Sequence, residues 1–419
     1  MIVDLRKDSP TFGLWCAVNL SKENRRQLFV PAGCGHAFLC LEDADMLYIQ
    51  GGCFDPSQEI DISPFDPVLD IRWPRIGVQE YIISSKDKAA PYMHDRKEFD
   101  TTPVAKKMRI LIVGASGQVG GALAEAFQSE HVIGTFNHKE CDGMVHFSLQ
   151  AAAENPSLAE DLITMCSPHV VCICAGMTWV DGCENAGDTP YLVNTEGPRV
   201  LARAAKRCGS KTVYYSSDYV FDGKVEGYIY TETDKVNAVN VYGQSKAAGE
   251  KAVLEEDPTS LVLRTTVVFG PEKQGKNFVY QLCRSLVEGK DMLCASDSFG
   301  SPTYNRDLAN MTKGLLECGE QGIFNCVGPQ TLTRVDFAKL IADTFGLDSR
   351  YILSVASDDL YDATLKNRGV AAHRGKHLGL DITKLKRALP ENFHPRSIKD
   401  ALLHWKQYPQ GADICFCLG

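Results

Sequence analysis

One segment, residues 109–120, constrains the fold of this chain more than any other. Residues 109–113 are typical of a buried strand, and Gly114, Gly117 and Gly120 follow with the spacing G-x-x-G-x-x-G before a helical run at 119–127. A strand that turns through glycines into a helix leaves free N–H groups and the positive helix end together, where a pyrophosphate can bind. Chance supplies about 0.2 such matches in this chain, so the preceding strand and following helix carry most of the weight. The alternative is a tight strand-to-helix turn that only needs small residues.

The sequence after this turn alternates between strands and helices. Strands are predicted at 131–136, 170–174 and 212–216, with helical stretches such as 198–207 between them. This alternation predicts a doubly wound parallel sheet of the Rossmann type, covered by helices on both faces. Beyond about residue 271, helices predicted at 278–288, 334–345 and 397–406 indicate a smaller C-terminal substrate lobe over the carboxyl edge of the sheet.

The N-terminal quarter has a different texture. Residues 1–92 predict a partial all-β domain with short strands at 27–30, 37–41 and 46–50, separated by turn residues. The polar stretch 93–107 is expected to be a linker, the larger α/β domain to span 108–405, and 406–419 to be a tail.

Charge and cysteine content exclude several classes of protein. The net charge is −9, from 53 acidic and 44 basic side chains, which argues against nucleic acid or an anionic membrane surface as the main partner. The 16 cysteines include no C-x-x-C pair, and the histidines lack metal-ligand spacing, so we expect reduced thiols and no metal site. Neither a signal peptide nor an apolar run of roughly 20 residues is present, and a cytoplasmic location is therefore expected.

Candidate catalytic residues lie in two segments. Tyr242 and Lys246 are four residues apart, which places them on one face of a helix, and the lysine charge is expected to lower the tyrosine pKa. Ser217 ends a predicted strand at the ligand-binding edge of the sheet and can hydrogen-bond a substrate carbonyl. Together the three residues fit hydride addition to a ketone, in which charge develops on oxygen and needs waiting donors.

These residues carry a resemblance to a known family. Residues 108 to about 405 resemble the 4-dehydrorhamnose reductases, which are extended short-chain dehydrogenases, through segments 114–120, 174–181, 216–221, 241–246, 276–278 and 297–303. The resemblance implies a nucleotide-sugar substrate, dTDP- or UDP-linked, whose 4-keto group is reduced. It implies substrate contacts at Ser217, Asp218, Val267 and Asn277, although bacterial enzymes have tryptophan where Val267 stands. Implied cofactor contacts are Gly114, Gly117, Gln118, Val119, Gly120, Gly176, Met177, Thr178, Tyr215, Tyr242 and Lys246.

The end of the second strand bears on which dinucleotide binds. An acid there would bond the ribose 2′-hydroxyl and favour NAD. Here Asn137 and His138 follow Phe136, and the first acid is Glu140. We therefore expect NADPH, with NADH as the other candidate.

Residues 1–92 resemble the cupin-like 4-dehydrorhamnose 3,5-epimerases. The resemblance includes 3–6, 9–13, 23–31 and 85–91, with His36 as a pocket residue, Tyr48 as the family's acid and Asp87 as the partner of its catalytic histidine. That histidine belongs to strands upstream of Met1, so about half of the jelly roll is expected to be absent and epimerisation inactive. The alternatives are a truncated bifunctional epimerase–reductase and a half-cupin retained for structure, which could pair with a second copy in a homo-oligomer.

Two other functions remain open for the larger part. One is a non-catalytic regulatory subunit like the β subunit of methionine adenosyltransferase, which the epimerase-like segment disfavours. The other is a nucleotide-sugar 4-epimerase or dehydratase, which retains its cofactor through the reaction.

Overall fold

A seven-stranded parallel sheet forms the centre of the larger domain. The computed structural model describes residues 1–22, 24–51, 59–74, 80–97, 99 and 107–407. The strand order is β6-β5-β4-β7-β8-β10-β15, so the chain reverses its direction of travel across the sheet beside β4. This confirms the predicted doubly wound fold. The strands are β4 (Arg109–Val113), β5 (His131–Phe136), β6 (Val145–His146), β7 (Val170–Ile173), β8 (Lys211–Ser217), β10 (Leu261–Thr265) and β15 (Gly322–Asn325).

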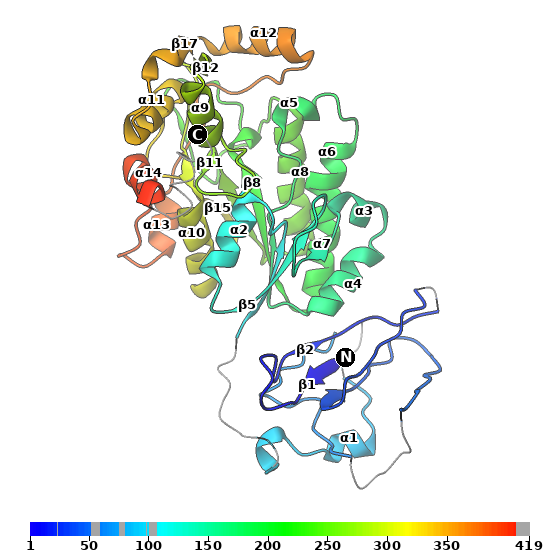
Figure 1. The fold of residues 1–419 in the computed structure, drawn as a ribbon. Coiled ribbons are helices and arrows are strands. Elements are labelled where there is room, and N and C mark those ends of the chain that lie inside the picture. Colours follow the sequence, from blue (N-terminus) through cyan, green and yellow to red (C-terminus); the bar gives the residue numbers. More distant parts are fainter. Residues whose placement is uncertain (23, 52–58, 75–79, 98, 100–106, 408–419) are drawn as a thin grey trace.

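Helices cover both faces of this sheet (Figure 1). Strand β4 shows why, because its side chains alternate: Ile110 and Ile112 join one apolar core, while Leu111 and Val113 join the other. A strand buried on both faces has no polar side, as its sequence indicates. The first core includes α2 (Gln118–Ala126) and α10 (Asn305–Glu317); the second includes α3 (Leu149–Glu154), α4 (Ser157–Cys166), α7 (Gly197–Arg207) and α8 (Val241–Glu256).

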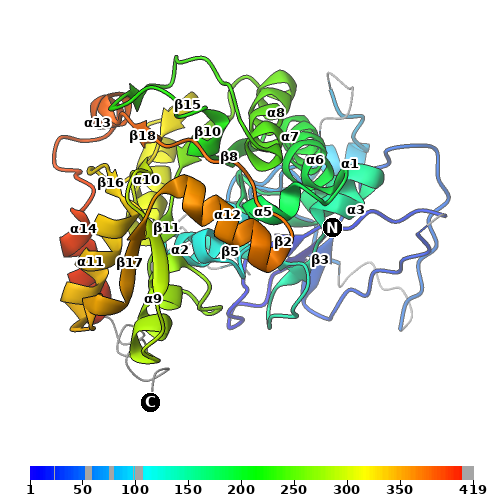
Figure 2. The ribbon, with the colours of Figure 1, turned by 90° about the horizontal axis from the view of Figure 1, so that it is seen from above.

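The C-terminal lobe has a separate core, which includes the fully buried Trp405. It contains α9 (Phe278–Val287), β12 (Met292–Ala295), α11 (Arg334–Phe345), β17 (Ile352–Val355), α12 (Ser357–Arg368) and α14 (Ile398–Gln407). Helix α12 lies across the end of the domain opposite the N-terminal unit (Figures 1 and 2). Among the described residues, no helix is both long and apolar enough to cross a membrane. Short elements complete the domain: α5 (Val180–Cys183), α6 (Thr189–Tyr191), η3 (Leu192–Glu196), η4 (Asp218–Val220), β9 (Ile229–Tyr230), β11 (Val268–Phe269), β13 (Phe299–Gly300), β14 (Thr303–Tyr304), β16 (Leu332–Thr333), η5 (Ser349–Tyr351), β18 (Gly379–Leu380) and α13 (Thr383–Ala388).

The N-terminal unit contains a small antiparallel sheet, but its strands are not those predicted. The sheet pairs β1 (Ile2–Asp4) with β2 (Trp15–Cys16) and β3 (Cys34–His36), and it is followed by α1 (Ser85–Ala89) and η2 (Met93–Asp95). The strands predicted at 27–30, 37–41 and 46–50 are wrong, since these residues lie in irregular backbone. A strand is held by a paired neighbour and a core. These three segments have neither a paired neighbour nor a core, because their apolar side chains are exposed: Phe29 is 83%, Leu47 87% and Ile49 90% exposed.

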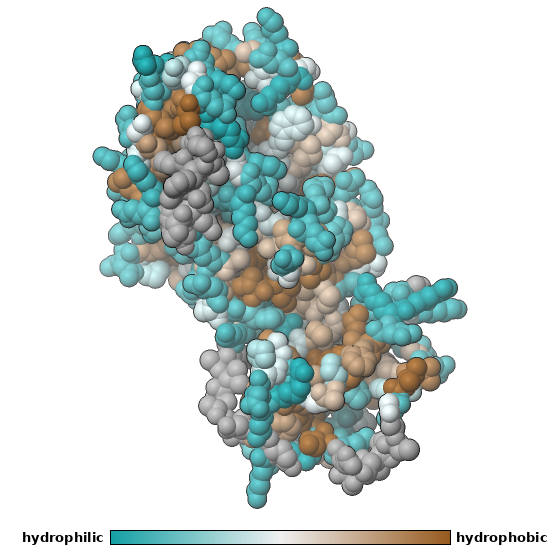
Figure 3. Space-filling view, in the orientation of Figure 1, coloured by the Kyte–Doolittle hydropathy of each residue, from teal (hydrophilic) through white to brown (hydrophobic). Residues whose placement is uncertain are grey.

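A small core holds this unit together. It includes Met1, Val3, Trp15 and Leu69, together with Met93 and Phe99 from the segment expected to be a linker. The packing of the N-terminal unit therefore continues past residue 92. Apolar residues also reach the surface of this unit on the face shown in Figure 3.

The two units meet at the amino-terminal edge of the parallel sheet. The Arg109 guanidinium, at the start of β4, donates to the Trp15 carbonyl at 2.7 Å and to the Cys166 carbonyl at 2.8 and 2.5 Å. Arg72 of the N-terminal unit donates to the carbonyls of Cys208 (3.0 Å) and Gly209 (2.6 Å), just beyond the end of α7. Carbonyls at helix C-termini carry partial negative charge, so guanidinium groups bind there favourably.

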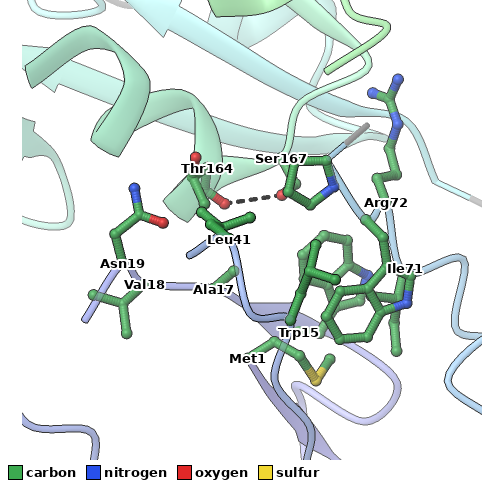
Figure 4. A pocket seen from close by; sticks show the side chains of 13 residues that line it. Met1, Trp15, Ala17, Val18, Asn19, Leu41, Ile71, Arg72, Thr164 and Ser167 are labelled. Atoms are coloured by element: carbon green, nitrogen blue, oxygen red, sulfur yellow. Dashed lines mark hydrogen bonds between the residues drawn. The ribbon is translucent and has the colours of Figure 1, made fainter. Parts of the chain in front are cut away.

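A cavity of about 60 Å³ lies in this junction (Figure 4). Trp15 and Leu41 line it from one unit and Thr164 from the other. The junction is therefore incompletely packed around these residues.

Candidate active site

The glycine turn between β4 and α2 leaves no room for side chains. Gly114 has a φ of +89°, and a Cβ there would lie 2.8 Å from the Ala175 nitrogen. A Cβ on Gly120 would lie 2.3 Å from the Gly114 oxygen, which is closer than real contacts allow. Gly117 is the N-cap of α2 and supplies no side-chain cap, so the first N–H groups of α2 are left for another acceptor.

Gln118 provides a direct test of whether an anionic cofactor fits here. Its amide nitrogen is buried without a hydrogen-bond partner among the described residues. A buried donor without a partner is unfavourable unless a ligand completes it. Val119 follows it in α2 and packs against the first core. The turn thus fits a dinucleotide pyrophosphate, as predicted.

The end of β5 presents polar groups. Asn137 and His138 are exposed, and the Asn137 amide lies 3.3 Å from the His138 ring nitrogen. Neither side chain is acidic, so neither would repel a 2′-phosphate.

Asn194 fixes the loop after β7, and sequence reasoning missed it. Its side-chain oxygen accepts from the Met177 N–H at 2.9 Å, and its amide donates to the Met177 carbonyl at 3.1 Å and to Ser245 of α8 at 3.0 Å. A Cβ on Gly176 would lie 2.9 Å from the Asn194 oxygen. Asn194 therefore locks residues 176–177 against the helix that carries Tyr242. No local motif marks it, because its partners lie 17 and 51 residues away.

Ser217 and Tyr242 are brought together, as predicted. Both side chains are buried, and the Ser217 hydroxyl lies close enough to the Tyr242 hydroxyl to influence its pKa. Asn240 caps α8 by accepting from the Gly243 N–H at 2.8 Å, which places Tyr242 in the first turn of the helix. A Cβ on Gly243 would lie 2.0 Å from the Tyr219 oxygen, so α8 packs directly on the loop that follows Ser217.

The expected lowering of the Tyr242 pKa is wrong. Burial raises the pKa of Tyr242 above its ordinary value of 10, and the nearby Ser217 hydroxyl only partly opposes this effect. Tyr242 therefore holds its proton throughout the neutral range, which suits a group that donates a proton to substrate.

Lys246 lies one helical turn further along α8, with its ammonium group turned toward the sheet. The nitrogen is 4.2 Å from the centre of the Tyr214 ring and 4.0 Å from the position of a Cβ on Gly176. Burial lowers the pKa of Lys246 to about 7, and Glu250 partly opposes this shift. Near neutral pH, Lys246 is therefore present in both its charged and its neutral form, and a ligand that binds beside it can shift this equilibrium.

Asp218 supports Ser217 from behind. Its two carboxylate oxygens accept from Ser217 at 2.9 Å and from Thr266 at 2.5 Å. Burial raises the pKa of Asp218 to about 6, although both hydrogen bonds lower it. The carboxylate is therefore engaged by protein hydroxyls, and its predicted contact with substrate stays a prediction.

Val267 has an unusual backbone next to this network. Its φ is +42°, a region that β-branched residues rarely adopt. It follows Thr266, and its side chain would lie 3.8 Å from a Cβ on Gly300 of β13. Strain of this kind is found at functional sites, where the surrounding structure enforces it.

Other predicted residues have mixed placements. The Tyr215 hydroxyl bonds the Thr312 hydroxyl in the core at 2.7 Å, and Thr178 is exposed. The Asn277 amide caps α9 and donates to the Gly270 carbonyl at 2.9 Å, which gives Asn277 a structural role in this structure. Their contacts with ligands stay predictions.

The epimerase-like residues do not form one cluster of contacts. The rings of His36 and Tyr48 lie 5.7 Å apart, with Tyr48 51% exposed. Asp87 instead accepts from the Ser84 hydroxyl at 2.6 Å at the start of α1. The roles implied by resemblance stay predictions for these three residues.

The fold and the site together define a class of enzyme. The sheet is of the nucleotide-binding type, and a buried Ser–Tyr–Lys set lies at the carboxyl ends of its strands. The site offers a proton donor at Tyr242, a second hydroxyl at Ser217 and a cation at Lys246, beside a turn that fits pyrophosphate. The protein is an oxidoreductase of the extended short-chain dehydrogenase class.

Comparisons with known proteins identify the family. Residues 108–405 match the family described as the RmlD substrate binding domain, and residues 1–95 match the dTDP-4-dehydrorhamnose 3,5-epimerases. The dTDP-4-dehydrorhamnose reductase of Aggregatibacter actinomycetemcomitans is 32% identical over 317 residues, which are 72% of this chain and 99% of that protein. The crystal structure of the Bacillus anthracis reductase in complex with NADP has a TM-score of 0.62 and 29% identity, covering 72% of this chain and 99% of that one. The chain belongs to the dTDP-4-dehydrorhamnose reductase family.

A relative with a different name shares the same part of the chain. Methionine adenosyltransferase 2 subunit beta of Bos taurus is 29% identical over 286 residues, which cover 66% of this chain and 81% of that protein. Similarity of the larger domain alone therefore does not separate a reductase from a regulatory subunit, and the catalytic residues must do so.

Proposed function

We propose that this protein reduces the 4-keto group of dTDP-4-dehydro-L-rhamnose to give dTDP-L-rhamnose, with NADPH as the hydride source. The observation that carries the proposal is the buried contact between Ser217 and Tyr242 beside the glycine turn. The names of the relatives support the substrate and the cofactor.

The residues of this chain divide the chemistry among them. The bound nicotinamide supplies a hydride. Tyr242 gives its proton to the carbonyl oxygen, and its raised pKa keeps that proton available at neutral pH. The Ser217 hydroxyl, which donates to Asp218 in this structure, would turn to donate to the same oxygen when substrate binds, while Thr266 continues to hold Asp218.

The dinucleotide would lie along the sheet's carboxyl edge. The first N–H groups of α2 and the Gln118 amide would hold its pyrophosphate, and Lys246 would hold the ribose hydroxyls. Preference for NADPH over NADH follows from Asn137 and His138, which are uncharged or basic where an acid would favour NAD. Side-by-side fluorescence titrations test this preference, and tighter binding of NADH would contradict it.

The reaction itself is tested by incubating the protein with NADPH and dTDP-4-dehydro-L-rhamnose, with UDP-linked substrate in parallel. We expect stoichiometric oxidation of NADPH and formation of a nucleotide-linked rhamnose, followed at 340 nm and by mass spectrometry. Tight NADPH binding without turnover of either substrate would favour the regulatory reading instead.

The domain boundaries and location form part of this proposal. The proposed units are an epimerase-like segment at 1–92, a connection at 93–107, of which Met93 and Phe99 pack on that segment, and the reductase domain at 108–405. A cytoplasmic location is also part of this proposal, and the low cysteine density of the sequence supports it. Homo-oligomer formation through the N-terminal unit is also proposed, and sedimentation of the intact chain tests it.

A further inference from the structure

A buried ion pair lies one turn of helix α8 beyond Lys246. Glu250 is four residues from Lys246 and eight from Tyr242, so the three side chains lie along one face of the helix. The Arg264 side chain on β10 donates to both oxygens of the Glu250 carboxylate, from Nε at 2.9 Å and from Nη2 at 2.7 Å. The side chains of Arg264 and Glu250 are 2% and 5% exposed, so the pair is closed off from water.

Arg264 is held on its other side as well. Its guanidinium carbon lies 5.0 Å from the centre of the Phe221 ring, and Nη1 donates to the Glu232 carbonyl at 3.4 Å. Strand β10 is paired on both sides, with Arg264 in register with Ser216 of β8 on one side and with β15 on the other. The guanidinium is therefore fixed by the sheet, and it fixes the position of the Glu250 carboxylate in turn.

The titratable groups that face Lys246 come from three elements. On α8, Tyr242 lies one turn before it and the Glu250 carboxylate one turn after it, while Cys174 after β7 and Tyr214 on β8 face it from the sheet. Burial raises the pKa of Cys174, Tyr214 and Tyr242 above their ordinary values, so these three groups stay neutral near pH 7. Among the described groups that face Lys246, the Glu250 carboxylate is therefore the one that supports its positive charge.

Spacing alone would bring Lys246 and Glu250 into direct contact. A lysine and a glutamate four residues apart on a helix commonly form an ion pair, as Lys251 and Glu255 do at 3.7 Å further along α8. In the part of the chain that the structure describes, Lys246 and Glu250 form no such pair, because both carboxylate oxygens are bonded to Arg264. Arg264 thus keeps Glu250 near enough to act on Lys246 electrostatically without bonding it.

A purely structural role accounts poorly for the Glu250–Arg264 pair. Taking two charges out of water is unfavourable, and apolar side chains of similar volume often stabilise a protein as well as a buried ion pair does. The surroundings would suit apolar replacements, since Phe221 and Tyr214 beside the pair are fully buried. Apolar replacements would lack only one thing, which is a carboxylate held at a fixed place beside Lys246.

We propose that Glu250 and Arg264 are positioning residues for Lys246: Arg264 holds the Glu250 carboxylate where it supports the ammonium group without capturing it. The ammonium group is then left to bond the ribose hydroxyls of the dinucleotide. This inference rests on the proposed function, in which Lys246 holds that ribose. It assigns opposite effects to the two partners. Without Glu250 the charge of Lys246 loses its support, whereas without Arg264 the released carboxylate bonds Lys246 and draws it away from the cofactor.

The experiment measures the NADPH affinity of the full chain by fluorescence between about pH 5.5 and pH 9, without substrate. Wild-type affinity should fall as the pH rises through the pKa of Lys246, about 7, because a charged donor binds hydroxyl groups more strongly than a neutral one. Glu250→Gln should move the midpoint of this fall down by about one pH unit, and Arg264→Met should move it up by about one. Arg264→Met should also weaken binding about 10-fold at pH 6, where Glu250 now occupies the ammonium group.

The double variant Glu250→Gln/Arg264→Met separates capture of Lys246 from general damage. With no carboxylate left to capture the lysine, its NADPH affinity at pH 6 should return to within about threefold of wild type, although its midpoint stays low. The matched control is the pair of Glu256, at the end of α8, and Arg203 of α7, which also forms two hydrogen bonds, at 3.0 and 2.6 Å. Glu256→Gln and Arg203→Met should keep the wild-type midpoint.

A structural role for the pair predicts a different result. Both single variants would then lose stability while their midpoints stay at the wild-type pH, and this outcome would overturn the proposal. Arg264→Lys covers the case in which Arg264→Met does not fold, because lysine keeps the charge but lacks the fork that bonds both oxygens. Arg264→Lys should move the midpoint up by a smaller amount, and a wild-type midpoint in this variant would also overturn the proposal.

Turnover separates this inference from the proposed function. If the wild type reduces the keto sugar and both single variants keep its midpoint for NADPH binding, the positioning role is wrong although the reductase function stands. If the two midpoints move in opposite directions but the wild type reduces no keto sugar, the proposed function is wrong although the positioning role stands.

Discussion

Replacing Lys246 with methionine should stabilise the folded protein, and the gain should depend on pH. Lys246 is 6% exposed, and burial lowers its pKa from 10.5 to about 7. Between these two values the unfolded chain binds the proton and the folded chain does not, so wild-type stability should rise with pH across this window. The destabilisation is complete below pH 7 and disappears above pH 10.5.

The size of the effect follows from the same two values. The difference of 10.5 − 7 = 3.5 corresponds to about 5 kcal/mol at 1.36 kcal/mol for each pKa unit. Between pH 9.5 and pH 6, the range in which unfolding can be measured, proton linkage predicts that this destabilisation of the wild type increases by about 3 kcal/mol. Methionine has a similar volume and carries no charge, so it avoids the penalty with little change in packing.

Urea unfolding of both proteins by circular dichroism at pH 6, 7, 8 and 9.5 measures the effect. The free energy of unfolding of the variant, relative to that of the wild type, should be about 3 kcal/mol larger at pH 6 than at pH 9.5. A difference between the proteins that is the same at every pH would refute the assignment of a desolvated, near-neutral lysine. The same variant should reduce substrate poorly, which would show that Lys246 is kept for function at the expense of stability.

Four further outcomes test the site and the N-terminal unit. Tyr242→Phe should lower turnover about 10²- to 10⁴-fold with unchanged NADPH affinity, and wild-type turnover would exclude Tyr242 as the proton donor. Gly120→Ala should abolish NADPH binding because its Cβ would lie 2.3 Å from a backbone oxygen, whereas Gly121→Ala, with its nearest atom at 3.8 Å, should bind normally. Val267→Gly should be more stable to urea than Val267→Ala by about 1 kcal/mol, since the φ of +42° strains alanine but not glycine; the reverse order would contradict strain. In D₂O the chain should not exchange the C3 and C5 protons of dTDP-4-dehydro-6-deoxyglucose, because Asp87 bonds a serine at the start of α1; rapid deuterium uptake by mass spectrometry would reveal an active base.

Local sequence was sufficient to predict the nucleotide-binding part of the fold. The strand at 109–113, its glycine turn and the following helix interact within about 20 residues, so their pattern contains most of their energetics. Strand β4 and helix α2 appear in the structure within one residue of their predicted bounds. The spacing of Tyr242 and Lys246 also predicted a helix there, although not its bounds or its Asn240 cap.

Properties set by burial or by distant contacts could not be predicted in this way. The pKa of Tyr242 depends on packing from several elements, and the charge of a lysine one turn away does not outweigh it. Asn194 bonds Met177 and Ser245, which lie 17 and 51 positions away in the sequence, so no spacing rule joins them. Residues 46–50 have the apolar sequence pattern of a strand, but a segment forms a strand only when it pairs with a neighbouring one.

The position of the N-terminal unit limits what it can contribute to reduction. It binds the amino-terminal edge of the sheet, where Arg109 begins β4, while the glycine turn and Tyr242 lie at the carboxyl ends of the strands (Figure 1). A five-residue strand spans roughly 16 Å, so a substrate released near one unit has no direct contact with the site of the other. The junction does reach the larger domain through Arg109 and through His169, whose ring accepts from the Arg109 N–H at 2.9 Å. The unit therefore contacts the starts of β4 and β7, at the edge of the sheet opposite Tyr242, and it shares no described catalytic group with the reductase site.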